Sequence, residues 1–137
     1  FRLGIMRYLE GAKHATGRVL FYYDPSKQDR TKYSREQTLR VLWYLAHAAR
    51  YLDSSSEESQ KKGIILLASN RYARISQFDR KVQQMYAESI RGCLPCRISA
   101  VFVCHPAPYS HILLAIFKLF IGKLMERVHV MTGTEGQ

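Results

Sequence analysis

The chain has 137 residues, a length typical of one domain with a buried core, and its 47% apolar content excludes a disordered segment. Its 21 Lys and Arg residues exceed its 11 Asp and Glu residues, which gives a net charge of +10 at neutral pH. This excess favours anionic partners, either nucleic acid or a membrane surface. A solvated basic surface without a dedicated partner explains it equally well.

The ends and the cysteines of the chain set further expectations. We expect one domain over residues 1–137, cut from a longer chain because it begins at Phe1 rather than Met. The longest run without charged residues, 98–117, contains Pro106 and Pro108, which a membrane-spanning helix would not place there. Three cysteines, an odd number, argue against a secreted disulfide framework and favour a cytoplasmic location.

Four short apolar runs predict β-strands. They are Val19–Tyr23, Ile64–Ala68, Ile98–Val103 and Val128–Met131. Because each run is nearly continuous rather than alternating, we expect strands that are covered on both faces. Helical patterns separate the runs, so the sequence predicts an α/β fold with a mainly parallel sheet and helices on its faces.

Local signals place the first two helices. An Asp24-Pro25-Ser26 turn follows the first strand, and Ser34 with Gln37 forms a capping box that starts a helix. The polar segment 54–59 reads as a loop. The second helix is predicted to end at Gly92.

The third helix, predicted within 109–125, is apolar on almost every side. A helix of this kind is buried, bound to a partner or in contact with a membrane. A lid over an apolar cavity that also presses into a bilayer would use all its faces. Its apolar residues are Ile112, Leu113, Leu114, Ile116, Phe117, Leu119, Phe120, Ile121, Leu124 and Met125.

Motifs for catalysis are missing from the sequence. It contains no P-loop, no dinucleotide-binding glycine motif and no nucleophile elbow. Cys93 and Cys96 form a C-x-x-C pair, but they follow a helix and precede a strand, the reverse of a thioredoxin-like site. The five histidines lack metal-ligand spacing. We therefore expect a protein that is not an enzyme and holds no metal or cofactor.

Basic and aromatic residues alternate at Arg71-Tyr72-Ala73-Arg74, followed by Arg80-Lys81. This pattern is compatible with nucleic-acid binding, in which cations contact phosphates and rings stack on bases. No known RNA-binding motif accompanies it, and we interpret it as a solvated entry to a helix.

Several segments resemble the CRAL-TRIO lipid-binding family. The residues Gly17–Tyr23 (GRVLFYY) are similar to the entry strand of that family. Pro95 and Arg97 match its Y-P-x-R-I pattern, Phe117–Ile121 (FKLFI) matches the F-K-P-F-L of its gate helix, and Arg127–Val130 matches its closing strand. Leu119 stands where the family places a proline.

The resemblance implies a domain whose sheet floors a hydrophobic pocket, covered by an apolar gate helix near the C-terminus that opens at membranes. It implies binding and exchange of a phospholipid, phosphoinositide or isoprenoid-like lipid by a cytoplasmic protein at an anionic membrane surface. The expected headgroup or membrane contacts are Lys118, Lys123 and Arg127. The expected pocket and gate residues are Leu20, Tyr22, Ile65, Leu67, Val101, Val103, Ile112, Ile116, Phe117, Phe120 and Leu124.

Two alternatives stay open at this point. The first is a protein-interaction module with a collapsed pocket, which docks a small GTPase or another regulator. The second is a basic nucleic-acid binder, whose affinity would fall steeply with salt.

Overall fold

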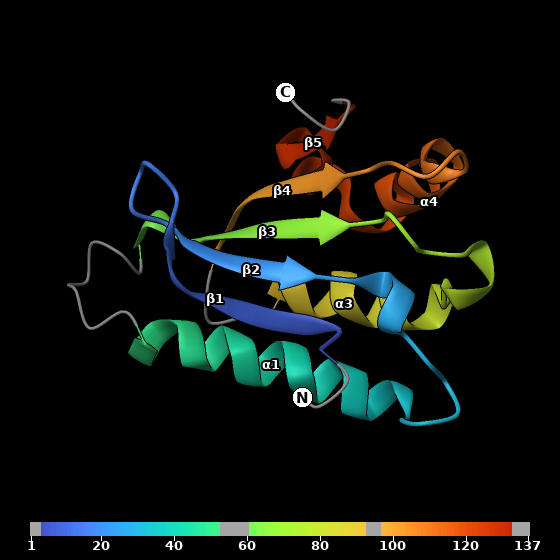
Figure 1. The fold of residues 1–137 in the computed structure, drawn as a ribbon, viewed down its shortest axis with the longest axis horizontal. Coiled ribbons are helices and arrows are strands. Elements are labelled where there is room, and N and C mark those ends of the chain that lie inside the picture. The colour runs from blue at the N-terminus through green and yellow to red at the C-terminus, as the bar shows by residue number, and fades with distance from the viewer. Residues whose placement is uncertain (1–3, 53–60, 93–96, 133–137) are drawn as a thin grey trace.

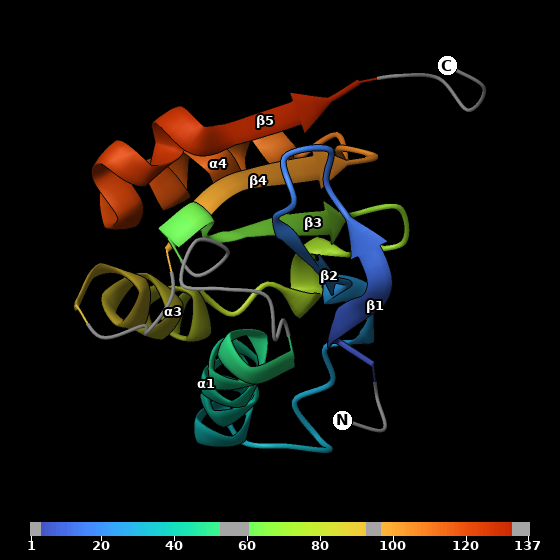
Figure 2. The same cartoon turned by 90° about the vertical axis from the view of Figure 1, so that its left-hand side faces the viewer.

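A five-stranded sheet with three helices forms the domain (Figures 1 and 2). The structure is a computed structural model that describes residues 4–52, 61–92 and 97–132. The described side chains exclude those of Lys13, residues 49–52, Phe117, Phe120 and Ile121. Predicted features at 54–59 and at Cys93 and Cys96 lie outside the described residues. The strands are β1 (Met6–Lys13), β2 (Val19–Tyr23), β3 (Ile64–Ser69), β4 (Ile98–Cys104) and β5 (Val128–Met131).

The strands are hydrogen-bonded in chain order, from β1 at one edge to β5 at the other. Strands β2 to β5 pair in parallel, which confirms the predicted α/β class, whereas β1 pairs with β2 in the antiparallel sense. Gly63 stands directly before β3 with a φ of +77°, and a Cβ there would lie 2.4 Å from the carbonyl oxygen of Arg97. Only glycine permits this close approach of β3 to β4.

The helices are α1 (Arg35–Leu52), α3 (Arg80–Gly92) and α4 (Ser110–Ile121). The capping box predicted for α1 is confirmed. The backbone N–H of Ser34 donates to Gln37 Oε1 at 2.7 Å, and that of Gln37 donates to Ser34 Oγ at 3.2 Å. The predicted end of the second helix at Gly92 is confirmed as well. Beyond α4, a 3-10 segment, η3 (Gly122–Arg127), leads into β5.

All three helices lie against the concave face of the curled sheet (Figures 1 and 2). Parallel strands added in one direction through crossovers of one hand place every connecting helix on the same side. In the described part of the chain, no helix lies on the convex face, where the unbroken apolar runs had suggested a cover. A row of paired residues crosses that face: Arg7, Tyr22, Leu67, Phe102 and His129.

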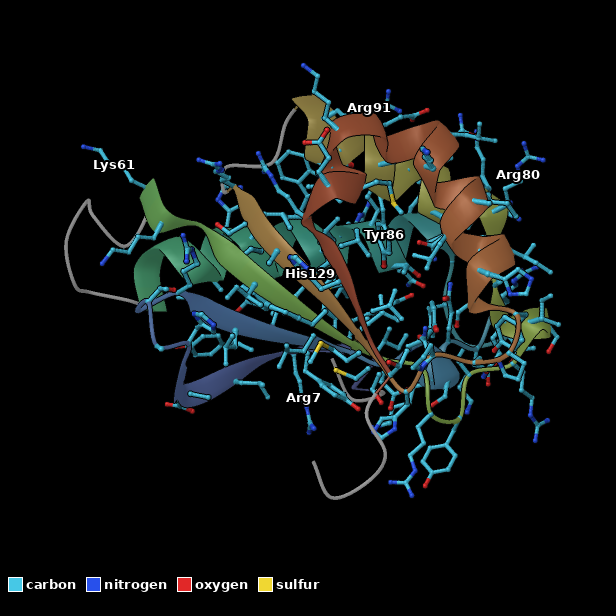
Figure 3. All side chains as sticks on the ribbon, turned by 90° about the horizontal axis from the view of Figure 1, so that it is seen from above. Arg7, Lys61, Arg80, Tyr86, Arg91 and His129 are labelled. Carbon is cyan, nitrogen blue, oxygen red and sulfur yellow. The ribbon has the colours of Figure 1, made fainter. Side chains whose placement is uncertain are left out.

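Contacts within this row stabilise the convex face. The Arg7 guanidinium lies 4.8 Å from the centre of the Tyr22 ring, and the rings of Phe102 and His129 stack with centroids 5.2 Å apart. Arg7 projects from one side of the sheet in Figure 3, where His129 lies on β5 at the opposite edge. Neighbouring side chains in the row therefore cover one another's faces, as cross-strand pairs do.

Candidate functional site

An apolar cavity of about 190 Å³ lies between the concave face of the sheet and the three helices. Alternate residues of each strand point into it, because successive side chains of a strand face opposite ways. Helix α1 contributes Leu42, Leu45 and Ala46, and α3 contributes Gln83, Tyr86, Ala87 and Ile90. The strand residues that line it are Met6, Phe21, Tyr23, Ile64, Leu66, Ala68, Ile98, Val101, Val103 and Val128.

The structure brings only some of the expected pocket residues to this cavity. Val101, Val103 and Leu124 line it. The expected residues of β2 and β3 do not, and their chain neighbours line it instead. An unbroken apolar run does not reveal which of its two alternating sets faces inward, so the inward set was misassigned by one position. The displaced residues are Leu20, Tyr22, Ile65 and Leu67.

Helix α4 closes one side of the cavity through Leu113 and Leu114. Ile112 is 48% exposed, and Ile116 is half-buried without lining the cavity. The side chains of Phe117 and Phe120 lie outside the described part.

Helix α4 packs mainly against α3 and η3. Its N-cap, Tyr109, provides no side-chain capping bond. Residues in the left-handed region of backbone space stand on either side of the helix, His105 with a φ of 52° and Gly122 with a φ of 49°. His105 directly follows β4, and Gly122 directly follows α4. A positive φ lets the chain change direction at these points.

Three polar side chains enter the middle of the cavity wall: Tyr23 from β2, and Gln83 and Tyr86 from α3. Tyr86 reaches from α3 into the space between the helices and the sheet (Figure 3). Burial raises the pKa of Tyr23 to about 12, although a hydrogen bond with Gln83 opposes the shift. Burial also raises the pKa of Tyr86. Both phenols are therefore neutral at physiological pH. Neither residue was among the predicted pocket residues.

The cavity ends in a polar group of residues at the carboxyl ends of the parallel strands, where α/β proteins commonly bind ligands. We call this group the polar end; it consists of Gln28, Asn70, Arg74, Gln77, Tyr109 and Ser110. Hydrogen bonds tie the loops there to one another. Gln77 Nε2 donates to the carbonyl oxygen of Ser26 at 2.5 Å, and the Tyr109 hydroxyl donates to that of Ala73.

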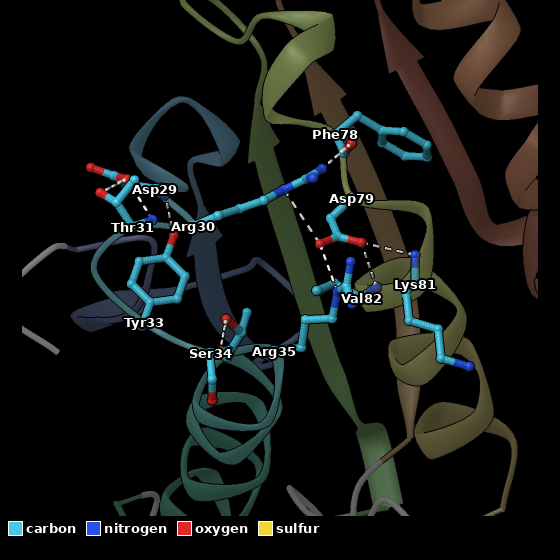
Figure 4. A network of polar contacts seen from close by, with 11 residues as sticks. Asp29, Arg30, Thr31, Tyr33, Ser34, Arg35, Phe78, Asp79, Lys81 and Val82 are labelled. Carbon is cyan, nitrogen blue, oxygen red and sulfur yellow. Dashed lines mark hydrogen bonds and ion pairs between the residues drawn. The ribbon is translucent and has the colours of Figure 1, made fainter.

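Asp79 holds the nearby start of α3 in place (Figure 4). Its carboxylate, 4% exposed, accepts from Arg35 Nε at 2.9 Å and pairs with Arg30 Nε at 3.4 Å. Its other oxygen caps the helix by accepting the backbone N–H groups of Lys81 at 3.0 Å and Val82 at 3.3 Å. Burial acts to raise the pKa of Asp79, but the hydrogen bonds from Arg35 and Val82 and the two arginine charges outweigh it and lower that pKa.

The expected headgroup residues do not line the cavity. Arg127 Nη1 donates to the carbonyl oxygen of Ile98 at 2.8 Å, where it joins η3 to the start of β4. Lys118 and Lys123 are exposed. The structure therefore does not bring these three cations together with the cavity.

Within the described residues, no cluster of three or more His, Cys, Asp or Glu side chains is arranged to hold a metal ion. In the same part of the chain, every helix falls short of the length and apolarity that a bilayer span requires.

Comparisons with known proteins identify the fold. A search among curated proteins found no significant sequence match. The crystal structure of Sfh5 is similar in fold, with a TM-score of 0.68 and 10% sequence identity over 93% of this chain and 46% of that one. The chain thus spans less than half of the Sfh5 chain. Residues 17–136 match the model of the divergent CRAL/TRIO domain. Because this match covers most of the chain, the protein belongs to the divergent CRAL/TRIO family and carries its lipid-binding fold.

Proposed function

We propose that this domain binds the apolar chain of a lipid in the cavity under the sheet and exchanges that lipid at a membrane when α4 moves outward. The observation that carries the proposal is the lining of the cavity. Among the described residues that line it, Arg74 is the only one with a charge. Burial of apolar chain gains about 0.8 kcal/mol per methylene, so a cavity of this kind favours a long hydrocarbon.

The volume of the cavity constrains the ligand. About 190 Å³ is smaller than the roughly 300–1,000 Å³ of common ligand pockets. A single chain fits this space better than a phospholipid with two chains. A larger lipid requires the outward displacement of α4, and the absence of a side-chain cap at the start of that helix supports such a displacement.

Exposed apolar side chains near the cavity support contact with a membrane. Tyr72 is 69% exposed and Ile75 56% exposed on the loop after β3, and Leu119 is 78% exposed on α4. The Tyr109 bond to Ala73 holds the loop and the start of α4 together. The chain as a whole has a net charge of +10, which favours anionic lipids, because each cation near such a membrane contributes about 1 kcal/mol.

The experiment is to purify the protein from cells, extract it with organic solvent and identify released molecules by mass spectrometry. A stoichiometric lipid is the expected result. A folded protein that releases no lipid and takes none up from vesicles would contradict the proposal and favour the protein-interaction module.

A transfer assay between vesicles tests the role of α4. Leu113→Asp places a charge on the cavity side of the helix and should abolish lipid uptake. Ala115→Asp places the same charge on an exposed residue of the same helix that does not line the cavity, and serves as the control.

A further inference from the structure

Ser110, the first residue of α4, has an unused hydrogen-bonding group. Its side chain lines the cavity, and the residue is only 7% exposed. Among the described residues, its hydroxyl oxygen is the one buried side-chain polar atom without a hydrogen-bond partner. Leaving a buried polar group without a partner is unfavourable, so Ser110 marks a position where a ligand atom would restore the lost bond.

The surroundings of Ser110 favour a negatively charged ligand atom. The start of a 12-residue helix carries a partial positive charge from its backbone N–H groups. Arg74 lines the same end of the cavity, and the Tyr109 bond to Ala73 joins the chain neighbours of Ser110 and Arg74. A hydroxyl donor, a helix start and a guanidinium together suit a carboxylate or a phosphate.

Among the described residues, the opposite end of the cavity offers no comparable group. Leu124, Met125, Val128 and Ile98 line it. Arg127, which adjoins Val128, does not line the cavity and donates to the Ile98 carbonyl. A hydrocarbon chain suits that end.

We propose that the ligand is an anionic single-chain amphiphile bound in one orientation. Its carboxylate or phosphate accepts a hydrogen bond from Ser110 Oγ and faces Arg74, and its chain extends toward Leu124 and Val128. The orientation rests on the proposed function, since it assumes that the cavity holds a lipid. This orientation is opposite to the one expected from the sequence, in which the headgroup contacts Arg127.

The test compares three probes with one hydrocarbon chain and different headgroups: oleate, oleyl phosphate and oleyl alcohol. The readout is the ratio of the affinity for each anion to the affinity for the alcohol. A hydrogen bond to a charged group is worth about 1.5–3 kcal/mol, so the wild-type ratio should be about tenfold or more. The anion with the larger ratio identifies the headgroup as a carboxylate or a phosphate.

Four variants assign that ratio to the two residues. Ser110→Ala and Arg74→Gln should each lower it about fivefold or more, whereas Ser110→Thr and Arg74→Lys, which keep the hydroxyl and the charge, should preserve most of it. Because the ratio is measured within one variant, partial loss of folded protein cancels.

Two results would overturn the orientation while leaving lipid binding intact. One is a wild-type ratio near one. The other is a ratio that Arg127→Gln abolishes and Ser110→Ala leaves unchanged. If none of the three probes binds to folded protein, the proposed function fails, and the orientation fails with it.

Discussion

Helices α3 and α4 enclose the same cavity but are held in different ways. Helix α3 buries one stripe, including Val82 and Ala87, and its first turn is fixed by the carboxylate of Asp79. Helix α4 exposes apolar residues such as Leu119, has no side-chain cap and lies between two residues of positive φ. The comparison teaches that the start of α3 is fixed by a side-chain cap, whereas the start of α4 has none, and this difference supports the proposed movement of α4.

The largest effect should come from the anchor of α3. Asp79→Ala removes the helix cap and leaves Arg30 and Arg35 unpaired. A fully buried pair would cost about 3–5 kcal/mol, but these arginines are 52% and 51% exposed, so we expect a loss of about 2 kcal/mol in the free energy of unfolding. Urea denaturation measures it.

Asp79→Asn is the matched control for this change. Asparagine caps helices as well as aspartate does, so Asp79→Asn should remove only the charge. It should lower the free energy of unfolding by about half as much as Asp79→Ala. If both variants unfold at the wild-type urea concentration, α3 is not anchored as described.

Acid should weaken the same anchor. Because the native state lowers the pKa of Asp79, the unfolded chain takes up a proton first, and the stabilisation is complete above about pH 4. It is lost as the pH falls through the lower native pKa. Between pH 5 and pH 2 the wild type should therefore lose more stability than Asp79→Asn; parallel stability curves would refute this.

A smaller effect is expected at the end of α4. Gly122→Ala puts a Cβ on a residue with a φ of 49°, and the backbone strain should lower the free energy of unfolding by about 1 kcal/mol. No atom lies within 4 Å of that Cβ, so a steric clash adds nothing. Thermal unfolding measures the change. Gly92→Ala, at the end of α3, also meets no atom within 4 Å but has no positive φ, and should be neutral or stabilising. Equal effects at the two glycines would contradict the backbone strain expected from the positive φ of Gly122.

The smallest effect on stability should follow a change on the exposed side of α4. Leu119→Asp should alter the free energy of unfolding by less than about 0.5 kcal/mol, because the side chain is 78% exposed. Binding to anionic vesicles should nevertheless fall about tenfold through the loss of one inserted apolar side chain. Ala115→Asp adds the same charge on the same helix without that loss, and should weaken vesicle binding less.

The edge strand β1 shows where sequence reasoning missed a usable signal. Met6 and Tyr8 pack with the core, while Arg7 between them lies on the convex face against Tyr22. This alternation is the pattern of a half-covered antiparallel strand. Because β1 contains no continuous apolar run, it was not among the predicted strands.

The sequence by itself determined the alternation of strands and helices from β2 to β5, the cap of α1 and the apolar character of α4, because these depend on residues that are close in the chain. It did not determine which face of each strand lines the cavity, since both faces of β2 and β3 are apolar and only the packing of α1 and α3 distinguishes them. Nor did it show that Ser110, Arg74 and Tyr86 line the same cavity, or that Arg127 donates a hydrogen bond to the carbonyl oxygen of Ile98. Those contacts join residues far apart in the chain, so only the tertiary structure decides them.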